Sequence, residues 1–261
     1  VLCAIAGKVP VLGLVTDEGR VAKWHIDVRL SEEPHWGVLG TAVGFKVVDQ
    51  VPYYTGIDQW IGMEDGKPDP IAVGKLKGMG SSSAASGAVG LYHVENVTPE
   101  AIEQGRDLLT DDHQTYVIDD AEYARIRENF PNLWKDPKGD PSVVAIGCPH
   151  NTYEEMVYWC EKLDKALKDA GQDKLAIPVA LASAVTVKEL LFDEHPLLCR
   201  DMKRAGVKFT HICTPMFMGL KGMADMTRGV TNSGKARTYT NLRIYDDDNL
   251  VKIAMTGKAP Y

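Results

Sequence analysis

Apolar residues in the second half of the chain fall into short runs separated by helical patterns. Residues 142–147, 175–181 and 207–212 are rich in Val, Ile, Leu and Ala, as expected of buried strands. Residues 152–171 begin with a Thr-x-x-Glu capping box, continue with apolar positions every three or four residues, and end at a glycine. A second helical pattern follows over about 184–204. Strands and helices that alternate at this spacing predict a parallel sheet with right-handed crossovers.

The pattern in the first half is less regular. Residues 9–15 and 21–28 are apolar and flank Asp17-Glu-Gly19, so they predict an N-terminal β-hairpin. A helix is predicted from Pro34 to about Val48. Residues 62–87 are rich in Gly, Pro and Ser, which predicts a surface loop, either mobile or ordered by a ligand.

The chain therefore divides into two predicted regions. A strand over 88–94 and a helix after Thr98-Pro99 complete the elements of the first. We expect a first α/β region over 1–135, with the hairpin and the Gly/Ser-rich loop, and a βαβαβ region over 136–261.

Two cysteines follow strands that should lie in the same sheet. Cys148 comes directly after the strand at 142–147, and Cys213 after the strand at 207–212. Ser183 lies just past the end of the strand between them. Because parallel strands end at one edge of the sheet, where ligands bind in open α/β folds, we expect Cys148 and Cys213 to be neighbours in space.

The position of Cys148 suggests reactive chemistry. It lies shortly before a predicted helix, whose free N–H groups and dipole would lower the pKa of the thiol. A thiolate here could be a nucleophile, with His150 or His211 as its base, or a metal ligand together with Cys213. Two thiolates are too few for a closed metal site, because iron–sulfur clusters take four ligands, or three when one iron stays open.

A donor-rich segment follows over residues 229–236. It nearly matches the phosphate-binding pattern G-x-x-x-x-G-K-[ST], but Ala236 stands where the hydroxyl should be, and no apolar strand is evident before it. Asn232, Ser233 and Lys235 nevertheless suit a carboxylate or a phosphate. The alternative is a solvated turn.

Composition narrows the class of protein. The 261 residues carry 36 Asp and Glu against 29 Lys and Arg, a net charge of −7, and 44% are hydrophobic. An acidic, ordinary globular composition argues against a nucleic-acid surface, and no apolar run approaches the ~20 residues of a membrane span. Five irregularly spaced cysteines and no recognisable secretory signal predict a cytoplasmic protein without a disulfide framework.

Taken in order, several motifs resemble the aconitase X family, specifically its large, catalytic subunit. The resemblance covers nearly the whole chain. It is carried by Gly90-Leu-Tyr-His-Val-Glu95 with Thr98-Pro-Glu-Ala101, Gly147-Cys-Pro-His150, Cys213 with Pro215, Thr231-Asn-Ser-Gly-Lys235, Val38-Leu-Gly40 with Val51-Pro-Tyr53, and Ala182-Ser183.

The resemblance implies a fold and an activity. The fold would consist of three-layer, aconitase-like α/β domains with parallel βαβ units and a cluster at the carboxyl ends of the strands. The activity would be that of a hydro-lyase that removes water from a small hydroxy acid. Mevalonate 5-phosphate is the favoured substrate and cis-3-hydroxy-L-proline the other.

The resemblance also implies roles for individual residues. Cys148 and Cys213 would be two of three cysteine ligands of an iron–sulfur cluster, [4Fe-4S] in preference to [2Fe-2S]. Lys235, Ser233 and Asn232 would bind the small anionic substrate. The third cysteine belongs to an N-terminal part of the family's large subunit that this sequence does not match, and the catalytic serine belongs to the small swivelling domain.

We therefore expect the C-terminal two thirds of a large subunit that works in a heteromeric complex. Its partners would be the small subunit, or swivelling domain, and the N-terminal part of the large subunit. Two other classes stay open at this point. One is a hydrolase or transferase that uses Cys148 as nucleophile, and the other is a cluster-free binding or assembly module.

Overall fold

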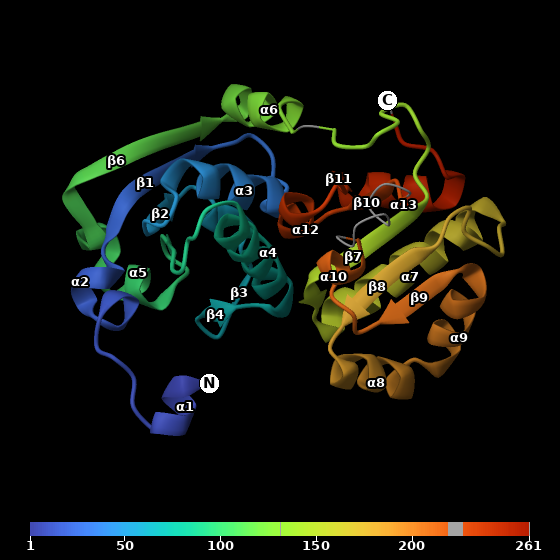
Figure 1. Cartoon of the computed structure of the whole chain (residues 1–261), viewed down its shortest axis with the longest axis horizontal. Helices are drawn as coiled ribbons and strands as arrows, with labels where there is room; N and C mark the ends of the chain where they lie inside the picture. The colour runs from blue at the N-terminus through green and yellow to red at the C-terminus, as the bar shows by residue number, and fades with distance from the viewer. Residues whose placement is uncertain (131, 219–226, 261) are drawn as a thin grey trace.

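Two parallel β-sheets, one in each half of the chain, organise the fold (Figure 1). The computed structural model describes residues 1–130, 132–218 and 227–260, without the side chains of residues 217 and 218. The mixed α/β class with parallel βαβ units is confirmed. The boundary at residues 135 and 136 stays a prediction.

The first sheet has the strand order β5-β2-β1-β6, and all its described pairings are parallel. Short helices and turns surround it, and an antiparallel pair, β3 with β4, precedes the long helix α4. The elements are α1 (Leu2–Ala6), η1 (Gly13–Val15), α2 (Asp17–Arg20), β1 (Ala22–Arg29), α3 (Trp36–Val47), β2 (Pro52–Thr55), η2 (Asp58–Trp60), β3 (Met63–Glu64), β4 (Lys67–Pro68), α4 (Pro70–Ser86), β5 (His93–Val94), α5 (Pro99–Gln104), η3 (Gly105–Leu108), β6 (Leu109–Asp119) and α6 (Asp120–Glu128).

The second sheet has the order β11-β10-β7-β8-β9, again with parallel pairings. The predicted βαβαβ order is confirmed, and so is the capping box at Thr152 and Glu155. The elements are β7 (Val143–Asn151), α7 (Tyr153–Ala170), β8 (Val179–Ser183), α8 (Val185–Glu194), α9 (Pro196–Ala205), β9 (Val207–Thr210), α10 (Thr214–Met218), β10 (Gly229–Thr231), α12 (Gly234–Tyr239), β11 (Arg243–Ile244) and α13 (Asp247–Thr256).

The predicted N-terminal hairpin is wrong. Residues 9–15 form no strand; they are largely exposed, and Thr16 instead caps the short helix α2. The second half of the expected hairpin is β1, which pairs in parallel with β2 and β6. The pattern missed this because the real partners of β1 lie far away in sequence.

The predicted Gly/Ser-rich loop is also wrong, since most of it is helix α4. The Asp69 carboxylate caps this helix by accepting a hydrogen bond of 2.7 Å from the Ala72 amide, and Pro70 occupies the first turn. Small residues let α4 approach α3 closely, because a Cβ on Gly40 would lie 2.1 Å from the Met79 carbonyl oxygen. Packing between helices thus outweighs weak helix propensity.

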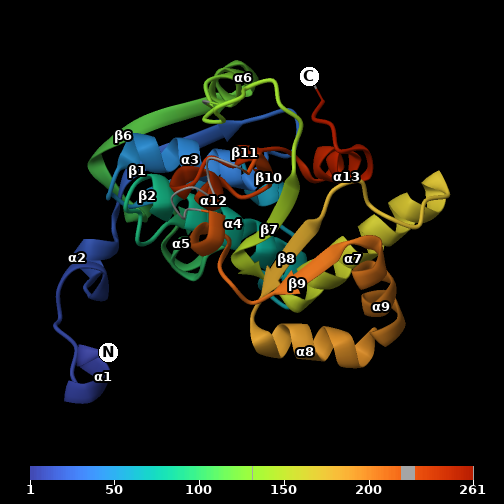
Figure 2. The ribbon, with the colours of Figure 1, turned by 45° about the vertical axis from the view of Figure 1, so that its right-hand side comes forward.

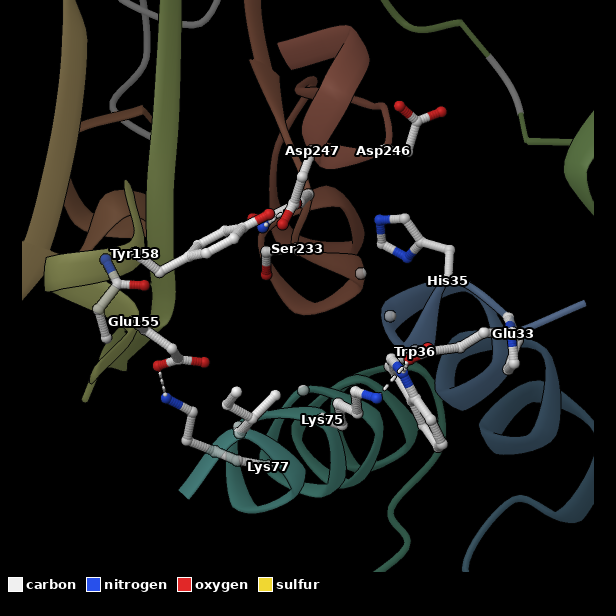
Figure 3. Close-up of a pocket in the computed structure, with 18 of the residues that line it drawn as sticks. Glu33, His35, Trp36, Lys75, Lys77, Glu155, Tyr158, Ser233, Asp246 and Asp247 are labelled. Atoms are coloured by element: carbon white, nitrogen blue, oxygen red, sulfur yellow. Dashed lines mark hydrogen bonds and ion pairs between the residues drawn. The ribbon is translucent and has the colours of Figure 1, made fainter. Parts of the chain in front are cut away.

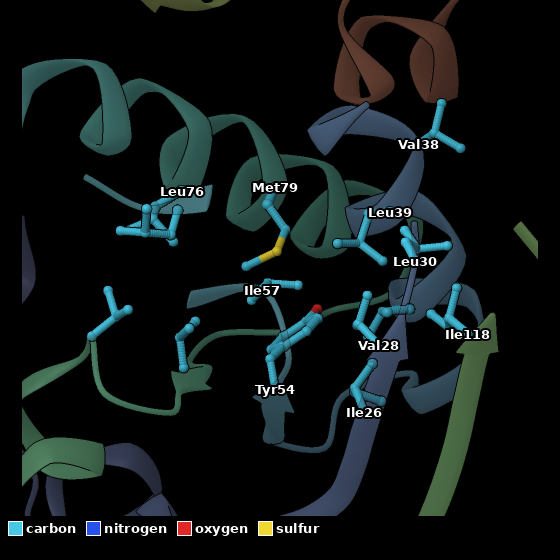
Figure 4. Close-up of a cluster of buried hydrophobic side chains, with 14 of the residues drawn as sticks. Ile26, Val28, Leu30, Val38, Leu39, Tyr54, Ile57, Leu76, Met79 and Ile118 are labelled. Atoms are coloured by element: carbon cyan, nitrogen blue, oxygen red, sulfur yellow. The ribbon is translucent and has the colours of Figure 1, made fainter. Parts of the chain in front are cut away.

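Each sheet carries its own hydrophobic core. In the first, Leu39 of α3 and Met79 of α4 point towards Ile26 and Tyr54 on the strands (Figure 4). In the second, side chains of α7, α9 and α13 pack against β7, β8 and β9. Helix α12 joins the two halves: it follows β10 of the second sheet but packs on α3 and α4 of the first, as two views agree (Figures 1 and 2).

Candidate functional site

Cys148 and Cys213 lie beside each other at the carboxyl end of the second sheet. Cys148 is in the last part of β7 and is 5% exposed, whereas Cys213 follows β9 and is half-buried. The two side chains are close enough for a hydrogen bond between the thiols. The structure therefore places these two cysteines together, as the strand order predicts.

The segment predicted to bind the substrate lies against this pair. Ser233 caps α12 by accepting a 2.9 Å hydrogen bond from the Ala236 amide, and its hydroxyl donates to the Cys148 carbonyl oxygen. Lys235, two residues after Ser233 in the first turn of α12, is near enough for its charge to act on the Cys148 thiol. Ser233 is only 8% exposed, so the segment is not the solvated turn that the sequence left open.

The expectation of a lowered pKa at Cys148 is wrong. Burial, together with the neighbouring Cys213, raises the pKa of the Cys148 thiol to about 11, and the nearby Lys235 and Ser233 offset only part of this rise. Cys148 lies within a strand, five positions before the helix begins at Tyr153, and therefore misses the helix terminus that motivated the expectation.

A cavity of about 1460 Å³ separates the two halves of the molecule next to Cys148. Ser233 lines it on one side and α4 on the other (Figure 3), and Asn232 is a further lining residue. Cys213 and Lys235 are not among its lining residues. Cys148 thus borders a space large enough for a small organic acid, and Cys213 lies behind it.

Ion pairs cross or border this cavity. The Lys77 ammonium on α4 pairs with the Glu155 carboxylate on α7 and donates a 2.8 Å hydrogen bond to the His150 carbonyl oxygen. Lys75 pairs with Glu33 at 2.8 Å near the start of α3. Figure 3 shows both lysines on the same side of the space. Lys77 therefore connects the two halves of the chain along the cavity wall.

A second group of polar side chains surrounds Asp247, the first residue of α13. Its Oδ1 accepts a 2.9 Å hydrogen bond from the Asn232 amide, and the Tyr158 hydroxyl is a further partner. Burial raises the pKa of the Asp247 carboxyl, although both partners oppose the rise. Because Asn232 donates its NH2 to Asp247, the orientation of this amide is fixed.

Sequence reasoning missed several residues of the cavity wall. Lys75 and Lys77 lie in the segment predicted to be a loop, and nothing in their spacing distinguishes them from surface lysines. Asp246-Asp-Asp248 ahead of an apolar helical pattern is a detectable helix start, and that signal could have located Asp247.

Ser183 ends β8 beside Asn151 and is fully buried.

The donor set for a metal is incomplete within this chain. Over residues 1–130, 132–218 and 227–260, no group of three or more His, Cys, Asp or Glu side chains could hold a metal ion. The chain brings two thiols together, and an iron–sulfur cluster that leaves one iron open needs three. The site therefore fits such a cluster in part.

No helix in the described part of the chain is long and apolar enough to cross a membrane.

Comparison with known proteins shows which proteins this chain is similar to. Residues 22–128 match the family model described as the aconitase X second domain. A phosphomevalonate dehydratase large subunit of Thermococcus kodakarensis is 29% identical over 260 residues, which covers 96% of this chain and 60% of that protein. The crystal structure of Thermococcus kodakaraensis aconitase X in its holo-form superimposes with a TM-score of 0.73 at 28% identity, covering 97% of this chain and 60% of that one. This chain is therefore similar to aconitase X over nearly its whole length, and its residues 22–128 match the second domain of that family.

Relatives of two named activities occur among the matching proteins. Besides the Thermococcus protein, a cis-3-hydroxy-L-proline dehydratase of Pseudomonas aeruginosa is 32% identical over 168 residues, which cover 60% of this chain and 26% of that protein. The chain spans about 60% of the length of its Thermococcus relative. The resemblance that the motifs carry is thus confirmed at the level of the family.

Proposed function

We propose that this chain is part of an aconitase-X-type hydro-lyase that removes water from a small hydroxy acid with the help of an iron–sulfur cluster. The observation that carries the proposal is the pairing of Cys213 with Cys148, which lines a large cavity beside the capped N-terminus of α12. The similarity of the chain to aconitase X proteins supports the same activity.

Cys148 and Cys213 would hold the cluster, with a third cysteine supplied from outside this chain. When bound, a cluster with one open iron supplies a Lewis acid that polarises the leaving hydroxyl and the carboxylate of the substrate. That requirement favours [4Fe-4S] over [2Fe-2S]. Because the thiol pKa of Cys148 is raised to about 11, ligation would release its proton.

The remaining residues would bind and orient the substrate. Asn232 and Ser233 line the cavity, and Lys235 lies next to Cys148 with a charge suited to an anion. Asp247 fixes the Asn232 amide, so that the amide oxygen is left to accept a hydrogen bond from a substrate hydroxyl. The base that removes the proton from the adjacent carbon would come from another domain, as the family resemblance implies.

Mevalonate 5-phosphate is the favoured substrate and cis-3-hydroxy-L-proline the alternative. Five of the matching curated relatives carry the name phosphomevalonate dehydratase large subunit, against one hydroxyproline dehydratase. The words "large subunit" in those names support a small-subunit partner. The five cysteines of the chain are all free, which agrees with a cytoplasmic location.

A nucleophilic role for Cys148 is not favoured. A thiolate nucleophile needs a lowered pKa and an accessible sulfur, whereas this thiol is buried and its pKa is raised. Inactivation by a thiol alkylator that is independent of iron would nevertheless restore this alternative.

A turnover assay tests the proposal. The natural enzyme that contains this chain, purified without oxygen, is incubated with each substrate, and loss of water is followed by NMR. We expect dehydration of mevalonate 5-phosphate, and a KM raised about tenfold or more by Lys235→Met. Lys258→Met, which removes an exposed lysine elsewhere, serves as a control matched in charge.

Two outcomes would count against the proposal. If neither substrate loses water in iron-replete enzyme, the assigned reaction is wrong. If the enzyme contains no iron or sulfide and yet folds and associates, the cluster-free binding module becomes the better description.

A further inference from the structure

A second cavity is lined by residues of α6, α12 and the connection from β11 to α13. Its volume is about 490 Å³. Three arginines, Arg127 of α6, Arg237 of α12 and Arg243 of β11, line it. Arg237 and Arg243 are six residues apart, whereas Arg127 is more than 100 residues away in sequence, so no local pattern indicates this cluster.

Two of the three guanidinium groups are held in fixed orientations. Arg243 donates from Nε to the Asn132 side-chain oxygen at 2.8 Å and from a terminal nitrogen to the Pro137 carbonyl oxygen, and it stacks 3.7 Å from the Trp134 ring centre. Arg237 lies over the Phe130 ring at 5.7 Å and is 9% exposed. A guanidinium carries five N–H donors, so these contacts of Arg243 leave donors to spare.

Among the described residues that line this cavity, arginines outnumber carboxylates. Asp246 is the one carboxylate among the described residues that line it, and its two oxygens already accept hydrogen bonds of 2.8 Å from the backbone and side chain of Asn249. His35 adds no charge near neutral pH, because burial lowers its pKa to about 4. Such a concentration of guanidinium groups is unexpected on a chain whose net charge is −7.

We propose that this cavity, lined by Arg127, Arg237 and Arg243, binds a phosphate group. Arginine forks match the oxygens of phosphate in pairs. Phosphate presents more acceptor oxygens than a carboxylate, so it can bind more than one of these arginines at once.

The phosphate has two possible sources, which share this chemistry. Arg127, His35 and Asp246 line both this cavity and the larger one, so the two spaces adjoin. A phosphorylated substrate could therefore place its phosphate among the arginines and its reacting end near Ser233. This first source rests on the proposed function, whereas a free phosphate that binds as a separate ligand does not.

Calorimetric titration of the natural enzyme with inorganic phosphate tests the site. Arg127→Gln and Arg243→Gln should each weaken phosphate binding about tenfold or more, as the loss of a charge-assisted hydrogen bond implies. Arg204→Gln, an exposed arginine on α9, is the control matched in charge and should leave binding unchanged. Arg127 is exposed, so its variant is expected to fold, which a circular dichroism melt confirms.

The proposal is overturned if phosphate does not bind, or if Arg204→Gln weakens binding as much as the two cavity variants. It is also overturned if Lys235→Met abolishes phosphate binding while Arg127→Gln leaves it intact. The phosphate would then lie beside Lys235 and Cys148 and not in the arginine-lined cavity. Competition identifies the source: a phosphorylated substrate that displaces inorganic phosphate shares the site, and one that leaves it bound points to a separate ligand. The titration needs neither cluster nor turnover, so its result is independent of whether the proposed dehydration is correct.

Discussion

Gly147 shows how tightly the backbone is packed where β7 approaches the cysteine pair. Its φ is +104°, and a Cβ there would lie 2.2 Å from the Ala182 carbonyl oxygen on β8. A side chain at this position would therefore meet both an unfavourable backbone conformation and a steric clash.

We expect Gly147→Ala to lower the free energy of unfolding by about 2 kcal/mol or more, as measured by urea denaturation. Gly78→Ala is the matched control, because Gly78 lies within α4 with open space around its Cβ position. That substitution should raise the free energy of unfolding by about 0.5–1 kcal/mol. Equal effects of the two substitutions would contradict this account of the strand.

His35 makes stability depend on pH. Burial lowers its pKa to about 4, whereas the unfolded chain takes up the proton near pH 6.5. Above pH 6.5 this difference has no effect, but as pH falls towards 4 only the unfolded state binds the proton. The residue therefore reduces the free energy of unfolding by up to about 3 kcal/mol across this window.

The variant His35→Asn isolates this contribution. Asn can still accept the hydrogen bond from the Val38 amide that caps α3, but it does not titrate. Urea denaturation at pH 7 and at pH 4.5 should show a smaller loss of stability on acidification in the variant than in the natural protein. Parallel losses in the two proteins would show that His35 does not contribute.

At the scale of residues, the sequence predicted which residue lies beside Cys148, but not the direction in which the pKa of its thiol shifts. Strand order alone placed Cys148 next to Cys213, because parallel strands end at one edge. The direction of the Cys148 pKa shift was wrong, since it depends on burial by residues distant in sequence, including Cys213 itself. Asp247 and the two lysines of α4 were missed for the same reason.

At the scale of elements, Glu155 links two structural roles. Its carboxylate closes the capping box of α7 by accepting a 2.7 Å hydrogen bond from the Thr152 amide, and it also pairs with Lys77 on α4. Gln at this position preserves the capping box but removes the charge.

A double-mutant cycle with Lys77→Met and Glu155→Gln measures the contribution of the ion pair that joins the two helices. We expect a coupling free energy of about 0.5–1 kcal/mol, because both side chains are about a quarter exposed. The exposed pair Lys165 and Asp169 within α7 is the comparison and should couple by no more than about 0.5 kcal/mol. A coupling near zero for Lys77 and Glu155 would mean that the pair does not hold the two helices together.

Elements whose stabilising partners are close in sequence were predicted well. Helix α7 has its capping box, apolar stripe and terminal glycine all within residues 152–171, and each of these features is present. Helix α4 was missed because its glycines and serines are explained by its close packing against α3, which the local sequence does not show. The N-terminal hairpin was wrong because β1 pairs with parallel strands that are distant in sequence. Both errors arise where tertiary packing outweighs local preference.

At the scale of the whole molecule, α12 brings the two sheets to a common site. Gly234 at its start is close to both α3 and α4: a Cβ would lie 2.2 Å from the Gly37 carbonyl oxygen and 2.7 Å from the Ser82 hydroxyl. The same turn carries Ser233 and Lys235 to Cys148. The candidate site therefore depends on both halves of the chain.

The central claim is that Cys148 and Cys213 together hold an iron–sulfur cluster. Iron and acid-labile sulfide are measured in the natural enzyme purified without oxygen, alongside Cys148→Ser, Cys213→Ser and the exposed control Cys3→Ser. Circular dichroism confirms that each variant is folded. The account predicts iron and sulfide in the natural enzyme and in Cys3→Ser, and their loss from both of the other variants. Full iron and sulfide in a folded Cys213→Ser protein, or none in the natural enzyme, would contradict it.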